Sequence, residues 1–297
     1  MYKGDLENVN NIVAIVVTYN RKNILKQCID KLQKQTYPTD ILVVDNASDD
    51  GTSEFVKKCK GVIYYNTGKN LGGAGGFQFG IKKAYDMGYK YFWLMDDDTL
   101  PYQNALEELM VVDRKIEKYG FLSSVAEWVD GSLCNMNIQR TGLYKKEINY
   151  SIPFSKIVMA TFVSFFIKRE IVEEVGLPIK EFVIWSDDLE YSRRISRLYS
   201  SYIVTKSKVL HKMKSNAKIG IESETSDRIW RYKMMYRNEV YVYRREGLKG
   251  WLFLWLRMIL HSVRIIFKAK SGKKEKLLII WKSFSDGFTF NPKIEKV

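Results

Sequence analysis

The chain has 297 residues, 46% of them hydrophobic, which is enough for a large core and argues against a disordered protein. Its formal net charge of +14 favours an anionic partner such as a nucleic acid, a phosphorylated substrate or an acidic membrane surface. The three widely spaced cysteines, Cys28, Cys59 and Cys134, support neither a disulfide framework nor a zinc site.

The first eight residues lack the apolar run of a signal peptide. We also expect no transmembrane span, because no uninterrupted apolar stretch reaches the length that a bilayer requires. Together with the cysteine content, these features predict a cytoplasmic protein.

The first hundred residues alternate between strand and helix patterns. Continuous β-branched runs at 11–17, 41–44 and 62–65 predict buried strands, and each is followed by a loop and a helical pattern. This alternation predicts right-handed crossovers and a mostly parallel sheet, with ligands at the carboxyl ends of the strands. Thr18 and Asp45 occupy such ends.

A glycine cluster at 71–77, Leu-Gly-Gly-Ala-Gly-Gly-Phe, opens the third helix. It is not a Walker A loop, because no Gly-Lys-Ser/Thr follows, and it lacks the spacing of a dinucleotide fingerprint. Glycines such as Gly72 and Gly73 either serve a tight turn with close helix packing or let the backbone approach a sugar nucleotide. The sequence leaves both interpretations open.

The stretch 91–101 organises the rest of the chain. Five apolar residues predict a buried strand that runs directly into Asp96, Asp97 and Asp98. Three adjacent carboxylates at the end of a buried strand are unfavourable unless a cation neutralises them, and hard cations such as Mg²⁺ or Mn²⁺ prefer oxygen ligands. A solvated acidic turn is the alternative, and the apolar strand in front of the carboxylates argues against it.

The pattern weakens from about residue 121 and returns at 158–167, which predicts a strand, and at 168–175, which predicts a short helix. A second acidic cluster then follows Trp185 at the start of a helix: Asp187, Asp188 and Glu190. A helix cap would need only one of these carboxylates, and crowded carboxylates have displaced pKa values that suit a general base. A strand at 201–205 leads to His211, which the residues alone leave open as a metal ligand or a surface residue.

These motifs, in this order, resemble the family 2 inverting glycosyltransferases. The motifs are Val-Val-Thr-Tyr-Asn-Arg, Val-Val-Asp-Asn-Ala-Ser, Asn-Leu-Gly-Gly-Ala-Gly-Gly-Phe, Trp-Leu-Met-Asp-Asp-Asp and Trp-Ser-Asp-Asp-Leu-Glu-Tyr. The glycine segment together with the triple Asp looks most like the galactofuranosyltransferase branch. The resemblance covers roughly 12–211 and implies an α/β fold of the GT-A type, which binds a nucleotide-diphosphosugar and transfers the sugar in a single displacement.

The resemblance also implies roles for individual residues. The donor would contact the first strand ends, the glycine segment and the acidic triplet: Thr18, Asn20, Arg21, Asp45, Gly72, Gly73, Asp96 and Asp97. Asp96, Asp98 and His211 would hold Mn²⁺ or Mg²⁺, and Asp188 would be the catalytic base. Trp185, Asp187 and Glu190 would contact the acceptor, although Ser186 separates Trp185 from the paired Asp residues where the family pattern has none.

The remaining third of the chain, 216–297, is expected to be a separate helical, basic region after a catalytic domain at 1–215. Polar residues recur at helical intervals in 251–268, so that one narrow basic stripe crosses an otherwise apolar helix. Trp251, Trp255 and the basic run 268–276 predict a helix lying in an anionic membrane interface. The alternative is packing on the catalytic domain or across a dimer interface.

The sequence therefore predicts a metal-dependent inverting glycosyltransferase, peripheral on the inner face of the cell membrane. The leading donor is UDP-galactofuranose and the acceptor a bacterial surface glycan or lipid-linked saccharide; dTDP-rhamnose is the alternative donor. A nucleic-acid-binding protein is a remote alternative, which leaves both acidic clusters unexplained. A catalytically silent glycan-binding homologue is disfavoured because both acidic clusters are intact, and the oligomeric state is left open.

Overall fold

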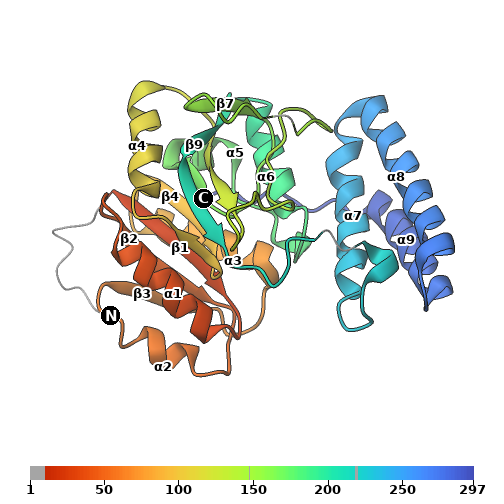
Figure 1. Cartoon of the computed structure of the whole chain (residues 1–297), viewed down its shortest axis with the longest axis horizontal. Helices are drawn as coiled ribbons and strands as arrows, with labels where there is room; N and C mark the ends of the chain where they lie inside the picture. The colour runs from red at the N-terminus through yellow and green to blue at the C-terminus, as the bar shows by residue number, and fades with distance from the viewer. Residues whose placement is uncertain (1–10, 147, 218–219) are drawn as a thin grey trace.

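A mixed sheet forms the centre of the computed structural model, which describes residues 11–146, 148–217 and 220–297. Within these residues the sheet has nine strands in the order β3-β2-β1-β4-β8-β6-β9-β5, with β7 paired to β9. Residues 1–8, on which the expectation about a signal peptide rests, lie outside the described part of the chain. Figure 1 shows helices covering the sheet and a separate group of C-terminal helices beside it.

The N-terminal half follows the predicted alternation closely. The strands are β1 (Ile12–Thr18), β2 (Asp40–Asp45), β3 (Val62–Asn66) and β4 (Tyr91–Asp96), and the helices between them are α1 (Lys22–Gln33), α2 (Thr52–Val56) and α3 (Gly72–Asp86). These four strands are parallel, and the register pairs Thr18 with Asp45 and Val17 with Asp96. The polar residues at the strand ends therefore meet at one edge of the sheet, as expected.

The second half corrects two expectations. It contains β5 (Thr99–Pro101), β6 (Leu122–Glu127), β7 (Phe154–Ile157), β8 (Phe165–Lys168) and β9 (Ser201–His211). Of its pairings only β6 with β9 is parallel, so the sheet is mixed rather than mostly parallel. The predicted strand at 158–167 is correct only at its end, because β7 ends at Ile157 and β8 begins at Phe165, after Ser164 at φ 62°.

Alternate residues of the central strands face two cores. On β1, Ile12, Ala14 and Val16 pack with α1 and α4 (Ala105–Lys115) on one face. Val13, Ile15 and Val17 pack on the other face with α3, α5 (Arg169–Val175) and α6 (Asp187–Ser196). Helices therefore cover both faces, which explains why these strands are continuous apolar runs.

The C-terminal region is helical, as predicted, and consists of α7 (Trp230–Arg244), α8 (Gly247–Lys268) and α9 (Lys273–Thr289). The sequence did not predict α9. The three helices share a third core, which also includes Ala74, Ile179 and Phe182 of the sheet-containing part. By length and composition alone, the helical stretch Trp230–Lys268 could cross a membrane. The sequence-based expectation of no transmembrane span required an uninterrupted apolar stretch, whereas this stretch is apolar on average and carries isolated charges.

Candidate active site

Asp96, Asp98 and His211 form a compact group of potential metal ligands at the carboxyl edge of the sheet. One ligand atom from each residue lies within 4.8 Å of the others. Asp96 ends β4, and the short strand β5 pairs with the end of β9 so that Thr99 lies opposite His211. Two carboxylate oxygens and an imidazole nitrogen are a donor set that fits Mn²⁺ or Mg²⁺, so the predicted ligands are brought together.

Hydrogen bonds orient the histidine of this cluster. His211 Nδ1 lies 2.8 Å from Asn137 Oδ1, and Nε2 lies 3.1 Å from Asp98 Oδ1. Because the amide oxygen can only accept, Nδ1 carries the proton and Nε2 faces the carboxylates. Partners of this kind fix the ring orientation of metal-binding histidines. Asn137 was not predicted.

The carboxylates next to the cluster are paired with residues that follow β1. Thr18 Oγ1 donates to Asp97 Oδ2 at 2.7 Å. The Arg21 guanidinium contacts Asp97 Oδ1 and Asp98 Oδ2, each at 2.9 Å, while 44% of its side chain stays exposed. Arg21 therefore lies at the solvent side of the triplet.

Burial and mutual repulsion shift the pKa values of the triplet. Burial and the nearby Asp98 charge raise the pKa of Asp96 to about 6, and burial raises the pKa of Asp97 to about 7. Burial opposes ionisation of Asp98 too, but the hydrogen bond and charge of His211, with Arg21, lower its pKa to about 2. Without a bound metal, the ionised Asp98 carboxylate is therefore stabilised by the two cationic groups that contact it.

The other predicted donor residues lie along the same edge of the sheet. Asp45 is fully buried and accepts hydrogen bonds from Tyr64 Oη at 2.7 Å and from the Ser48 amide at 2.8 Å. Asn20, at φ 53°, accepts from the Asp49 amide at 2.8 Å. These contacts fix the loops after β1 and β2 next to each other.

The second acidic cluster begins α6. Asp187 is buried, and burial together with the Asp188 charge raises its pKa well above the usual range. Burial raises the pKa of Asp188 to about 7, although the Leu189 amide donates to its Oδ1 at 2.7 Å. Glu190 points elsewhere: its carboxylate forms a two-point contact with Arg194 on the next turn, at 3.0 and 2.9 Å.

A cavity of about 610 Å³ joins the two acidic clusters. Its lining includes Gly73, Asp96, Trp185, Asp187, Asp188 and His211. The other predicted site residues are not part of this lining: Thr18, Asn20, Arg21, Asp45, Gly72, Asp97, Asp98 and Glu190. The volume lies in the range of small-molecule sites. The predicted base, one face of the predicted metal group and the predicted acceptor tryptophan therefore share one space.

The C-terminal helices close this cavity on one side, which the sequence did not reveal. Tyr232, Met235 and Glu239 of α7 and Arg257, His261 and Arg264 of α8 also line it. The basic stripe of α8 thus faces the cavity. Its polar spacing was visible in the sequence, but the surface that it faces was not. Burial, with the charges of Arg257 and Arg264, lowers the pKa of His261 to about 3, so this imidazole is neutral.

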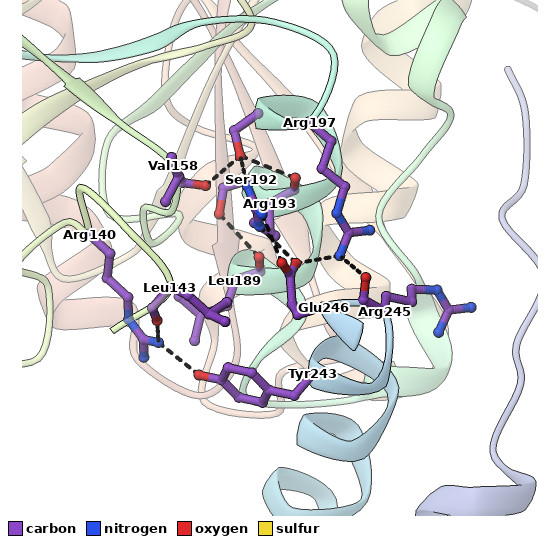
Figure 2. A network of polar contacts seen from close by, with 11 residues as sticks. Arg140, Leu143, Val158, Leu189, Ser192, Arg193, Arg197, Tyr243, Arg245 and Glu246 are labelled. Carbon is purple, nitrogen blue, oxygen red and sulfur yellow. Dashed lines mark hydrogen bonds and ion pairs between the residues drawn. The ribbon is translucent and has the colours of Figure 1, made fainter. Parts of the chain in front are cut away.

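Figure 2 shows a polar network that ties α6 to the α7–α8 junction. Glu246, which precedes α8, receives two hydrogen bonds of 2.8 Å from Arg193 of α6 and a further one from Arg197. Nearby, Arg140 donates to Tyr243 Oη of α7 at 2.8 Å. The helix that carries Asp188 is therefore fixed to the C-terminal region by side-chain pairs.

The comparison with known families settles the family. The model of glycosyl transferase family 2 matches residues 13–176, more than half of the chain. The chain belongs to glycosyltransferase family 2. It is 26% identical over 204 residues to "Galactofuranosyltransferase GlfT1" of Mycolicibacterium smegmatis, covering 63% of this chain and 65% of that protein. This confirms the predicted likeness to galactofuranosyltransferases, although the chain spans less than two thirds of that relative.

Solved structures agree on the fold. The mannosyltransferase PcManGT from Pyrobaculum calidifontis, in complex with GDP-Man and Mn²⁺, matches 96% of this chain and 77% of that one with a TM-score of 0.57 and 14% identity. S. aureus TarS 1–349 in complex with UDP matches 94% of this chain and 72% of that one with a TM-score of 0.55, again at 14% identity. The chain therefore has the predicted GT-A fold, with a mixed sheet flanked by helices and C-terminal helices.

Proposed function

We propose that this family 2 chain is a metal-dependent, inverting galactofuranosyltransferase that uses UDP-galactofuranose. The observation that carries the proposal is the single cavity shared by Asp96 and His211 on one side and Asp188 on the other. The likeness to GlfT1 supports the choice of sugar, and the complexes of the structural neighbours with UDP, GDP-Man and Mn²⁺ support a nucleotide-sugar donor and a divalent metal. The acceptor is a growing bacterial glycan or a lipid-linked saccharide.

In this mechanism Asp188 accepts the proton of the acceptor hydroxyl as its oxygen attacks the anomeric carbon. The bond from that carbon to the diphosphate oxygen breaks, UDP leaves with the electron pair, and the configuration inverts without a covalent enzyme intermediate. A divalent cation held by Asp96, Asp98 and His211 would neutralise charge on the departing diphosphate. Arg21 adds a positive charge beside the same carboxylates.

Environment separates the roles of the paired carboxylates. Asp188, with a pKa of about 7, is partly ionised at neutral pH and can act as the base. Burial and the Asp188 charge raise the pKa of Asp187 well above its usual range, which favours the protonated form; that form can donate a hydrogen bond to an acceptor hydroxyl or to Asp188. Trp185 lines the same cavity and offers an apolar face to a sugar ring.

A thermal-shift titration with UDP and with dTDP, each with and without Mn²⁺, tests the donor assignment. A ligand that binds only the folded state raises the melting temperature. At a ligand concentration of one hundred times Kd, it adds about 2.7 kcal/mol to the free energy of unfolding. We expect the largest shift with UDP and Mn²⁺ together, followed by release of UDP from UDP-galactofuranose in the presence of acceptor. Preference for dTDP would favour the rhamnosyl alternative, and no shift with either nucleotide would refute a nucleotide-sugar site.

The outer surface of α8 and α9 supports attachment to the inner face of the cytoplasmic membrane. Leu252, Leu256 and Phe267 of α8 are 62%, 57% and 80% exposed, and Trp255 and Trp281 lie partly exposed beside them. Lysines that adjoin this apolar surface supply attraction to anionic headgroups: Lys268, Lys270, Lys273, Lys274 and Lys282. An exposed apolar helix face flanked by cations suits an anionic lipid surface better than water.

Flotation with phosphatidylglycerol vesicles, compared with phosphatidylcholine vesicles, tests this attachment. We expect the full chain to bind the anionic vesicles in a salt-sensitive way, and the double substitution Leu256→Glu, Phe267→Glu to abolish binding. Leu198→Glu is the matched control, because Leu198 is 60% exposed and lies outside α8 and α9, just after α6. Equal binding by the double variant and the control would contradict a role of α8. A dimer that is lost in the double variant and kept in the control would assign the apolar face to a second copy instead.

A further inference from the structure

The loop in front of the predicted base has an unfavourable backbone conformation. Val183, Trp185 and Ser186 have φ values of 64°, 63° and 67°, in the left-handed region that non-glycine residues rarely adopt. At Val183 the ψ value is −62° and the Ile184 amide donates to the Phe182 carbonyl at 2.7 Å, which forms a γ-turn of a rare, strained kind. Such a conformation persists only where the surroundings fix it.

One side chain of α7 supplies much of this fixation. Asn238 is fully buried, and its Nδ2 donates to the carbonyl oxygens of Phe182 at 3.0 Å and Trp185 at 2.9 Å. The Ile184 carbonyl lies 3.4 Å from the same nitrogen. The Arg237 guanidinium in turn donates to Asn238 Oδ1 at 2.8 and 3.1 Å, so both ends of the amide are used. Asn238 thus holds both ends of the strained loop together.

The opposite side of the loop rests on the glycine segment of α3. The Ala74 amide donates to the Val183 carbonyl at 3.2 Å, and a Cβ atom on Gly72 would lie 2.2 Å from that carbonyl oxygen. Gly72 therefore permits a close backbone approach, as one of the two sequence interpretations expected. The loop is held between the predicted donor segment and α7.

We propose that Asn238 is a positioning residue for transfer: by holding loop 182–186 against α3, it sets the start of α6 so that Asp188 faces the metal group across the cavity. The inference rests on the proposed function, since it takes Asp188 as the base. The inference follows from the position of Asp188 in the chain. Ser186, the last strained residue of the loop, is followed at once by α6, and Asp188 is the second residue of that helix. Misplacing a reacting group by about 1 Å can reduce a rate by about 100-fold.

A purely structural asparagine would give a different result. Loss of a core hydrogen bond lowers stability but leaves kcat of the remaining folded protein unchanged. A positioning residue affects kcat while the predicted metal ligands on β4 and β9 and the predicted donor residues after β1 and β2, which lie outside loop 182–186, stay intact. Two measurements therefore separate the roles: kcat at saturating donor, and the Kd for UDP with Mn²⁺.

The experiment uses the full chain with Asn238→Ala and Asn238→Asp. The Asp variant keeps the volume and the contact with Arg237 but loses both donor hydrogens toward the loop. We expect kcat for transfer from UDP-galactofuranose to fall about 100-fold in both, as expected for a displaced base, and the Kd for UDP with Mn²⁺ to stay within about threefold. Ser262→Ala is the matched control, because among the described residues its buried hydroxyl bonds within α8, to the Met258 carbonyl at 2.8 Å; this variant should keep wild-type kcat.

Hydrogen exchange of peptides covering 182–190 gives a readout that needs no activity. We expect faster exchange there in both Asn238 variants, with α8 peptides unchanged. Unchanged exchange, a kcat within threefold of wild type, or a Kd for UDP that weakens in parallel with kcat would overturn the proposal. Failure of both variants to fold would do so as well, since Asn238 would then be needed for the fold itself.

The same readouts distinguish the inference from the proposed function. If the wild-type chain transfers no sugar from any tested donor but the loop still loosens in the Asn238 variants, the proposed function fails while the link between α7 and the loop stands. If wild type is active and the variants lose neither loop protection nor kcat, the positioning role fails alone.

Discussion

The pH dependence of transfer follows directly from the surroundings of Asp188. Burial, with a contribution from the Asp96 charge, raises its pKa to about 7. Only the ionised carboxylate can accept the acceptor proton, so kcat should rise with pH and level off near pH 8. With a pKa of about 7, roughly one molecule in eleven carries the ionised base at pH 6 and ten in eleven at pH 8, which predicts about a tenfold increase.

Asp188→Asn removes the base and should lower kcat by about 10²- to 10⁴-fold and flatten the profile. The assay measures UDP release between pH 5.5 and 8.5 at saturating Mn²⁺, because Asp96, with a pKa of about 6, titrates in the same range when no metal is bound. The Kd for UDP with Mn²⁺, measured over the same range, separates binding from chemistry. A variant that keeps more than a tenth of wild-type kcat would refute the assignment, as would a flat wild-type profile.

The same substitution has a predicted effect on stability. A carboxyl group whose pKa is raised by folding binds more protons in the folded state than in the unfolded state, so its contribution to stability falls as pH rises from about 4 to 7. Asp188→Asn removes this unfavourable ionisation. The melting temperature of the variant should therefore exceed that of wild type at pH 8 and equal it near pH 4. A lower melting temperature at pH 8 would indicate that Asp188 is held by contacts that favour its charge.

Two further substitutions test the metal group, and a third tests the ion pairs that connect α6 to the α7–α8 junction. Asp98→Ala should weaken Mn²⁺-dependent UDP binding and leave metal-independent binding unchanged; calorimetry with and without Mn²⁺ measures both, and equal loss would contradict a ligand role. Asn137→Ala frees the His211 ring and should weaken Mn²⁺ affinity by about tenfold, measured by titration; an unchanged Kd would show that the ring is fixed otherwise. Glu246→Gln weakens the charged pairing with Arg193 and Arg197 and should cost about 2 kcal/mol in urea unfolding; a cost under about 0.5 kcal/mol would mean that the pair is solvent-screened.

The sequence predicted the donor side of the site because of the geometry of parallel strands. Buried parallel strands are continuous apolar runs, and their carboxyl ends meet at one edge, so Thr18, Asp45 and Asp96 could be placed together without coordinates. The acidic triplet and the pair at Asp187 were recognisable from charge after apolar residues. The grouping of His211 with Asp96 and Asp98 came from the family resemblance, and β5 pairing with β9 explains it.

What the sequence could not predict depends on contacts across long separations. The run 158–167 is apolar because Met159 to Val163 cross the core as a loop, and apolarity indicates burial without specifying a strand. Trp93 Nε1 donates to Ser164 Oγ at 2.8 Å, which helps fix that loop. Asn137 and Asn238 carry no periodic signal, since their importance comes from partners 74 and more than 50 positions away. No local pattern records such partners.

The C-terminal third shows why a boundary at residue 215 does not by itself divide the functions. Helix α8 has three faces: Leu254, Met258 and Ile265 are buried, the stripe of Arg257, His261 and Arg264 lines the cavity, and the outer residues are exposed and apolar. Because the cavity-lining stripe and the exposed apolar face belong to the same helix, a surface that contacts the apolar face would lie next to the cavity. Because α7 also holds the loop before Asp188, the proposed contact with an anionic membrane and the proposed position of the base depend on the same pair of helices.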